Sequence, residues 1–276
     1  MSYNHYWTRS NPGIIIILID QSVGMSELLD DRKKSDIAAD FVNCFIAESC
    51  NRFVNNGAMI LPSAFISLIG YYDNKIKIIR KSSILEMIEN PLKIDTYKKQ
   101  ISDGIGGFVE IDYSIPIQVL PKATGNKPME KGFEFSMHEI NEFIKRKNDI
   151  DLQTLIRPIV INICEGIPTN GLESVRSTVN KLSTIHIPSG SPIIINIVLG
   201  CGEKYIFPTK LMDLADKVSS AKLYFDISST LPISIHKLLD LGFNVDEKSR
   251  YLFYNVVNDD LGRISSACHC LIYSAS

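Results

Sequence analysis

Three short polar stretches interrupt apolar sequence and carry the residue types that could do chemistry. The first, DQSVG, holds Asp20, Ser22 and Gly24 directly after the apolar run IIIILI. The second, ATGNKPM, places Lys127 before a helical pattern, and the third, CEGIPTN, places Glu165 after the apolar run IVINI. Buried charges need partners, so an acid and a lysine brought together where strands end can neutralise one another.

Buried strands that alternate with amphipathic helices must position these stretches. This alternation predicts an α/β fold, a Rossmann-like three-layer α/β/α sandwich whose central sheet of about six strands is mostly parallel, with one short antiparallel edge. Functional groups in such sheets collect where strands end, so we expect the three stretches to meet there. Strands are expected over 14–19, 61–72, 76–79, 159–163, 193–199 and 222–226, and helices over 34–55, 129–147, 172–182, 209–218, 233–241 and 251–267.

The chain is expected to form a single domain over residues 1–276, because no composition shift or linker divides it. The segment 104–120, GIGGFVEIDYSIPIQVL, breaks the alternation and predicts an insertion-like extension or hairpin. A C-terminal helical segment is expected near 249–270. The charged run 30–36, DDRKKSD, follows the first polar stretch and is expected to border the site.

Composition excludes several classes of partner. The formal charge of -2, from 29 basic and 31 acidic residues, leaves no dense basic stripe for nucleic acid. The longest apolar stretches are too short to cross a bilayer and the N-terminus has no apolar signal core, so we expect no membrane association and a cytoplasmic location. The six cysteines lack the spacing of a disulfide framework and are expected to be reduced.

Enzymatic interpretations find little support. A phosphoryl-transfer aspartate at Asp20 usually brings a second acid two residues on, where this chain has Ser22, and a serine nucleophile elbow would need a glycine at the position of Asp20. The DGIGGF stretch lacks the Lys-Ser/Thr of a phosphate loop, and the CHC stretch at 268–270 cannot complete a tetrahedral zinc site. His138 and His186 have no evident acid partner in the sequence, so neither is expected to act as a base.

In order and context the three stretches resemble a von Willebrand factor A (vWA) domain, most closely the short intracellular bacterial members of tellurite-resistance-type gene clusters. In that family the first strand ends in Asp-x-Ser-x-Ser, the second loop reads Gly-x-Thr-Pro-Leu, and the fourth-strand loop reads Thr-Asp-Gly-x-Pro-Thr-Asp. The matching stretches here are DQSVG, GNKPM and CEGIPTN, and the resemblance covers almost the whole chain. The family's loops build a metal-ion-dependent adhesion site, in which Mg²⁺ keeps one position open for a ligand carboxylate.

The chain departs from this pattern at three of the five expected positions, which makes the site degenerate. Asp20 and Ser22 match, but Gly24 replaces the second serine, Lys127 the threonine and Glu165 the second aspartate. An ammonium beside a metal ion is repelled by roughly 4 kcal/mol even at an effective dielectric constant of 20. We therefore expect Lys127 to replace the metal and to pair with Asp20 and Glu165, leaving no cofactor. The alternatives are a Mg²⁺ ion held by Asp20, Ser22 and Glu165, and an outward-swung lysine beside an empty site.

The resemblance implies a non-enzymatic protein-binding module or adaptor in bacterial stress or phosphorylation-linked signalling. Its strand-end loops would grip a protein partner, with the lysine accepting an acidic side chain by charge-assisted hydrogen bonds. One alternative is a Mg²⁺-dependent switch whose partner supplies the acidic ligand. The second is a structural subunit with a relic site, whose partner surface lies elsewhere, for example on 104–120. The sequence does not define an oligomeric state.

Overall fold

The central sheet has seven strands in the order β10-β11-β9-β8-β1-β4-β5. The computed structural model describes residues 11–54, 64–102, 104, 106–169, 171–211, 219–231 and 236–273. Five strands run parallel, and β5 and β10 pair antiparallel at the two edges. The predicted α/β fold class is confirmed, with a second antiparallel edge added by β10. The strands are β1 (Gly13–Asp20), β4 (Ala64–Tyr72), β5 (Lys75–Ser83), β8 (Ile159–Glu165), β9 (Ile193–Leu199), β10 (Tyr205–Ile206) and β11 (Leu252–Val256).

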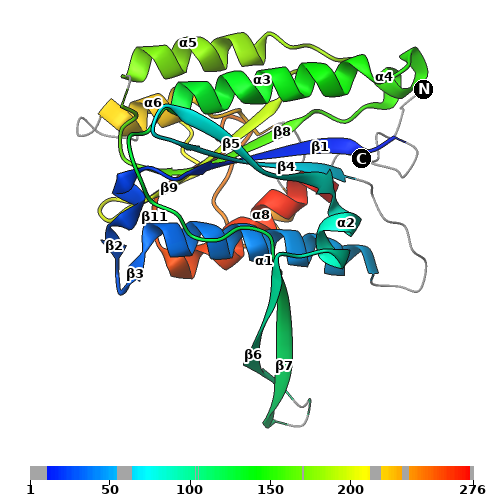
Figure 1. Cartoon of the computed structure of the whole chain (residues 1–276), viewed down its shortest axis with the longest axis vertical. Helices are drawn as coiled ribbons and strands as arrows, with labels where there is room; N and C mark the ends of the chain where they lie inside the picture. The colour runs from blue at the N-terminus through cyan, green and yellow to red at the C-terminus, as the bar shows by residue number, and fades with distance from the viewer. Residues whose placement is uncertain are drawn as a thin grey trace.

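Helices cover both faces of the sheet (Figure 1). Both faces of the sheet are apolar and are buried under helices. In β1, for example, Ile15 and Ile17 belong to the apolar cluster on one face, and Ile14 and Ile16 belong to the cluster on the other. The first cluster lies under α1 (Lys34–Val54), α2 (Ile84–Glu89), α7 (His236–Asp240) and α8 (Leu261–Tyr273). The second lies under α3 (Met129–Lys145), α5 (Leu172–Ser183) and α6 (Ser219–Ile227), and α4 (Asp149–Thr154) follows α3.

The site is positioned where the chain changes direction within the sheet. The strands β1 and β8 are neighbours at its centre, and their carboxyl ends lie at the same edge. The helix α1, which follows β1, covers one face, and α5, which follows β8, covers the other. Loops that diverge to opposite faces in this way form the usual ligand position of open α/β sheets.

The strand predicted at 222–226 is wrong, since these residues belong to α6. Lys222 and Asp226, four residues apart, are exposed, whereas Ala221, Tyr224 and Phe225 between and before them are buried. This is a helical period, and the short apolar run LYF hid it.

The C-terminal helical segment predicted near 249–270 is also wrong in its first part. Leu252–Val256 forms β11, parallel to β9, and Leu252 and Phe253 are fully buried between the two helical layers. The helix α8 begins only at Leu261. The helix predicted at 209–218 lies mostly outside the described residues.

A two-stranded arm extends from the α1 side of the sandwich (Figure 1). It consists of β6 (Lys93–Ser102) and β7 (Phe108–Ile117), which pair antiparallel over their whole length. The predicted extension over 104–120 is therefore one half of a hairpin, and its other strand was missed because Lys98, Lys99 and Gln100 interrupt the apolar alternation. Two further strands, β2 (Leu28–Leu29) and β3 (Arg32–Lys33), form a small hairpin before α1. Within the described ranges, no helix is long and apolar enough to cross a membrane.

Candidate functional site

Backbone hydrogen bonds join the first polar stretch to the second. The Val23 N–H donates to the Gly125 carbonyl (2.9 Å), and the Thr124 N–H donates to the Gln21 carbonyl (2.7 Å). Gly125 has a φ of +65°, and a β-carbon there would lie 2.5 Å from the Asp73 β-carbon, so only glycine fits this close approach. The two stretches therefore form one connected surface at the end of β1.

Thr169 joins the second stretch to the third. The Lys127 N–H donates to the Thr169 hydroxyl (2.8 Å), and the Thr169 N–H donates to the Lys127 carbonyl (3.1 Å). Behind them, the Tyr224 hydroxyl donates to the Gly166 carbonyl (2.9 Å). The sequence signal for Thr169 was its place in the CEGIPTN stretch, but its role in fixing the backbone of Lys127 appears only in three dimensions.

Lys127 lies between two carboxylates at the centre of the three loops. Its Nζ is 3.3 Å from Asp20 Oδ2, and it also forms an ion pair with Glu165 Oε1 and donates to the Glu165 carbonyl. The exposed fractions of the three side chains are 4% for Lys127, 0% for Asp20 and 16% for Glu165. The other Asp20 oxygen, Oδ1, accepts a hydrogen bond from the Ser22 N–H (2.8 Å). The buried acid is thus neutralised from within the chain.

Burial and charge set the protonation of this cluster. Burial raises the pKa of Asp20, and the attraction of Lys127 opposes that rise. Burial alone would lower the pKa of Lys127, but the carboxylates of Asp20 and Glu165 outweigh it and hold this pKa above its ordinary value. Lys127 is therefore a charged ammonium at neutral pH.

A second lysine, Lys34, extends the cluster to the surface. Its Nζ lies 3.6 Å from Glu165 Oε2 and 2.6 Å from Glu27 Oε2. The order Asp20, Lys127, Glu165, Lys34, Glu27 alternates acid and base from a fully buried residue to one that is 64% exposed. We call this row the charge ladder. The sequence had placed the run containing Lys34 at the border of the site without assigning it a partner.

The structure brings all five predicted site residues together. Gly24 lies against the Glu165 carboxylate, and Ser22 is buried beside Asp20. The Ser22 hydroxyl makes no hydrogen bond of good geometry to another described residue. The same holds for Asp20 Oδ2, whose contact is the ion pair with Lys127.

As arranged, these residues do not fit a divalent cation. A metal shared by Asp20 and Glu165 would lie against the Lys127 ammonium, which already contacts both acids. Gly24 supplies no hydroxyl ligand. Elsewhere in the described part of the chain, no group of three or more His, Cys, Asp or Glu side chains is placed to hold a metal.

A row of buried polar side chains supports the site from below. The Tyr71 hydroxyl donates to Asn162 Oδ1 (3.0 Å), Asn162 Nδ2 to Asn196 Oδ1 (3.0 Å), and Asn196 Nδ2 to the Ser228 hydroxyl (2.9 Å). Satisfied networks of this kind favour one arrangement of a core. Next to the row, burial raises the pKa of the Cys164 thiol to about 12.

Apolar side chains are exposed around the charge ladder. Val23 belongs to the first loop, Leu28 follows Glu27, and Ile167 belongs to the third loop. All three are more than half exposed, at 61%, 67% and 52%. We call this set the loop face. These residues give the loops beside the charge ladder an apolar, exposed character.

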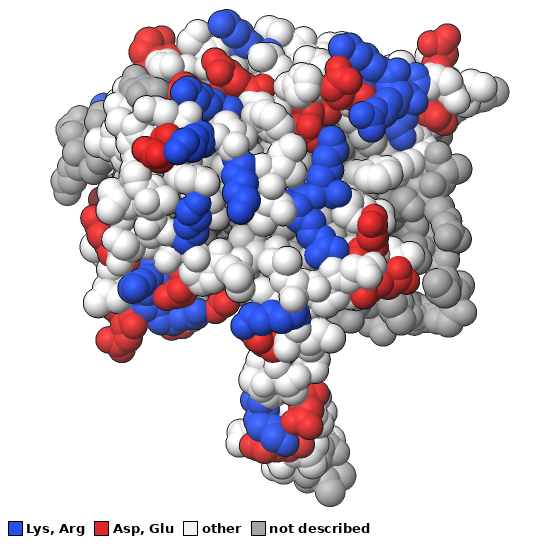
Figure 2. Space-filling model, in the orientation of Figure 1, with Lys and Arg blue, Asp and Glu red and all other residues white. Residues whose placement is uncertain are grey.

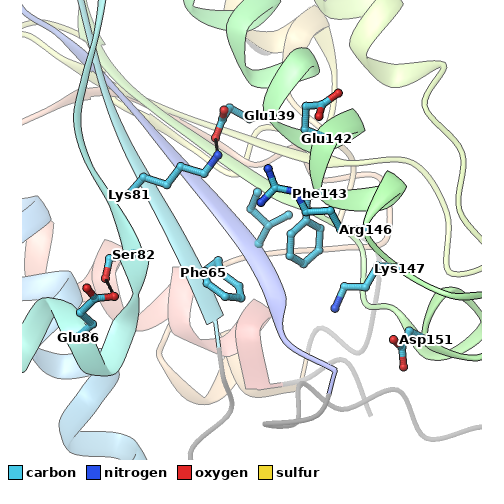
Figure 3. Close-up of a pocket in the computed structure, with 11 residues that line it drawn as sticks. Phe65, Lys81, Ser82, Glu86, Glu139, Glu142, Phe143, Arg146, Lys147 and Asp151 are labelled. Atoms are coloured by element: carbon cyan, nitrogen blue, oxygen red, sulfur yellow. Dashed lines mark hydrogen bonds and ion pairs between the residues drawn. The ribbon is translucent and has the colours of Figure 1, made fainter.

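A separate cavity of about 540 Å³ lies at the opposite end of the sheet. Ile14 near the start of β1, Phe65 near the start of β4, and Phe143 late in α3 line it (Figure 3). Lys81 points to the buried Glu139, and their atoms are 2.7 Å apart. This cavity contains none of the predicted site residues.

The other residues considered from sequence lie apart from the charge ladder. His138 on α3 and His186 in a loop are exposed. In the CHC stretch of α8, Cys268 and His269 are buried, and His269 Nε2 lies 2.7 Å from the Ser49 hydroxyl of α1. The stretch thus packs a helix against its neighbour.

Comparisons with known proteins give remote similarities. The sequence matches no protein-family model and no curated protein. Proximal thread matrix protein 1 from the mussel byssus is 13% identical over 94% of this chain and 48% of its own, with a TM-score of 0.49. A structure of that protein with a zinc-occupied MIDAS motif gives 12% identity, 96% and 47% coverage and a TM-score of 0.41. Manganese-loaded TRAP protein from Plasmodium vivax gives 13% identity, 70% and 59% coverage and a TM-score of 0.36.

The chain spans about half the length of the mussel protein. At these levels of identity and TM-score, the similarities carry no inference about function. The sheet order and the convergence of the three loops therefore stand on the structure alone. Together they define an α/β sandwich with an internally neutralised charge cluster at its strand ends.

Proposed function

We propose that this chain is a non-enzymatic, vWA-type protein-binding module that uses the loop face without a metal ion. The observation that carries the proposal is the position of the Lys127 ammonium between Asp20 and Glu165. In this proposal the Lys127 ammonium holds the loops together by pairing with their acids, as a bound metal ion would do. Buried charges need such partners, because an unpaired one is costly.

The charge ladder indicates which lysine a partner can reach. Lys127 is 4% exposed and already contacts two carboxylates and a carbonyl, so it has little capacity for a further acid. Lys34 is also mostly covered, but its contact Glu27 is solvent-exposed and held by a surface ion pair. Such pairs contribute about 0–1 kcal/mol and exchange readily. In this proposal a partner's acidic side chain replaces Glu27 on Lys34, while its apolar residues cover the loop face.

The chemistry of the site supports binding rather than catalysis. The acids and lysines of the ladder are paired with one another, and the raised pKa of Cys164 keeps that buried thiol protonated. No described pair of nucleophile and base is placed together at the loop face. The cytoplasmic location and the bacterial stress or phosphorylation-linked context belong to the same proposal, and the sequence resemblance alone supports them.

Affinity capture with matched surface variants tests the function. Ile167→Asp places a charge on the loop face, and Ile150→Asp makes the same change on α4, where Ile150 is also exposed. The proposal predicts a protein retained by the wild type and by Ile150→Asp, lost with Ile167→Asp, and unaffected by EDTA. Equal capture by both variants, or release by EDTA, would contradict it.

A further inference from the structure

The two faces of the arm differ in character. Because side chains alternate along a strand, the register of β6 and β7 places Tyr97 and Ile101 on one face with Val109, Ile111 and Tyr113. Lys93, Asp95 and Lys99 of β6 share this face. The opposite face is mostly polar, with the following residues in its centre: Thr96, Lys98, Gln100, Glu110, Asp112 and Ser114. The first face is therefore apolar along β7 and at Tyr97 and Ile101, with charged residues at the other β6 positions. We call it the apolar face.

The apolar face is covered only near the body of the protein. Ile115 and Ile117 are buried against Ala47 of α1, and they form a small cluster of their own. Farther out, Tyr97, Ile101, Val109 and Ile111 are between 37% and 46% exposed. An isolated two-stranded hairpin is marginally stable in water, and a third strand or a packing surface is normally needed.

We propose that the arm is a self-association surface, on which β6 of one copy pairs antiparallel with β6 of a second copy of this chain. In the described structure β6 pairs with β7 alone, so its outer edge is open. Pairing two such edges builds a four-stranded antiparallel sheet and places the Tyr97 face of both copies on the same side. The β7 edge is less suited, because Pro116 has no N–H to donate.

The sequence of β6 selects one register. A two-fold axis at Tyr97 places Asp95 opposite Lys99 of the second copy, twice by symmetry, and keeps Tyr97 and Ile101 of both copies on one side. A two-fold axis at Thr96 would place Lys93 of one copy opposite Lys99 of the other. An axis at Lys98 would place the two copies of Lys98 opposite each other. The Tyr97-centred register is the one of these three without a like-charge pair.

The same register accounts for exposed apolar residues at the two ends of the polar face. Ile94 and the preceding Leu92 lie at the root of the arm, and Phe108 lies at its tip. All three are more than half exposed. In the Tyr97-centred pairing, Leu92 comes opposite Ser102 of the second copy, and Phe108 of that copy lies one strand beyond the small serine. The root of each arm thus meets the tip of the other.

The charge of the arm also favours a second copy over a strongly charged partner. Its two strands carry equal numbers of basic and acidic residues, and both signs lie close together along it (Figure 2). On its polar face, Lys98 pairs with Asp112 at 2.8 Å. A balanced surface offers no net attraction to nucleic acid or to an acidic protein.

Charge exchange on β6 tests this register in the full chain by sedimentation velocity. The wild type is expected to be a dimer at micromolar concentration. Asp95→Lys places a lysine opposite Lys99 of the second copy, and Lys99→Asp places an aspartate opposite Asp95 of that copy. Each variant therefore faces like charges and should raise the dimer dissociation constant by at least about tenfold. The double variant D95K/K99D restores opposite charges and should restore the dimer.

Glu110→Lys is the matched control, because it makes the same charge change on the outer strand of the arm. It should remain dimeric. The rescue by D95K/K99D separates loss of pairing from loss of folding. A monomeric wild type, single variants that dimerise normally, or a double variant that stays monomeric would each overturn the proposal.

Discussion

A β-carbon added to Gly24 would lie 2.2 Å from Glu165 Oε1. The glutamate is one methylene longer than an aspartate, and it occupies the space that a side chain at position 24 would need. Gly24, Glu165 and Lys127 therefore form a matched set, in which the missing side chain admits the longer acid and the longer acid reaches the lysine. Three residues that are far apart in the sequence thus depend on one another in the structure.

Gly24→Ser tests this matched set. The added side chain should displace the Glu165 carboxylate from Lys127 and lower the free energy of unfolding by about 1–3 kcal/mol, the usual cost of overpacking. Glu165→Asp shortens the acid, so the double variant G24S/E165D should recover part of the loss. Urea denaturation measures both effects. Gly262→Ser is the control, because a β-carbon at Gly262 meets no atom within 4 Å, and a Gly24→Ser variant as stable as this control would refute the matched set.

Lys127→Met tests the built-in cation. The substitution leaves the fully buried Asp20 without its counter-charge and should cost roughly 3–5 kcal/mol at pH 7. Lys127 opposes the rise that burial causes in the pKa of Asp20, so its removal raises that pKa further. A folded-state pKa above the unfolded value gives stability that is present at low pH and lost as the pH rises through the folded pKa. The deficit of the variant relative to wild type should therefore be smaller at pH 5 than at pH 7.

A surface lysine provides the comparison for that experiment. Lys75 pairs with Asp73 at 3.0 Å, but both side chains are exposed. Lys75→Met should change the free energy of unfolding by less than about 1 kcal/mol at either pH. If both lysine variants lost the same free energy of unfolding, the ion pairs of Lys127 would contribute no more than a surface ion pair, which would contradict the account.

The sequence predicts the parts of this site that depend on strand ends. The apolar runs of β1 and β8 place Asp20 and Glu165 at one edge of the sheet. The turn residues before the helical pattern at 129 place Lys127 in a loop that is expected at the same edge. Lys34 could not be assigned, because its contact with Glu165 depends on how α1 begins beside β8. The strand predicted at 222–226 fails for a related reason, since a short apolar run has no period long enough to separate helix from strand.

Cysteine labelling tests the burial of the site from within. Burial raises the pKa of Cys164 to about 12, so almost none of it is the reactive thiolate at pH 8. Iodoacetamide should modify the exposed Cys201 in the native protein and leave Cys164 unmodified until urea is added. Peptide mass spectrometry reads each position. Labelling of Cys164 at a rate close to that of Cys201 would mean that the site is open to solvent.

Calorimetric titration of Mg²⁺ and Mn²⁺ into the wild type and into Lys127→Thr tests the central claim most directly. The substitution removes the ammonium and supplies a hydroxyl ligand beside Asp20 and Glu165. Circular dichroism on the same samples establishes that both proteins are folded. We predict that Lys127→Thr binds a divalent ion and that the wild type shows no binding at millimolar metal. Binding by the wild type with an affinity similar to that of the variant would contradict the account.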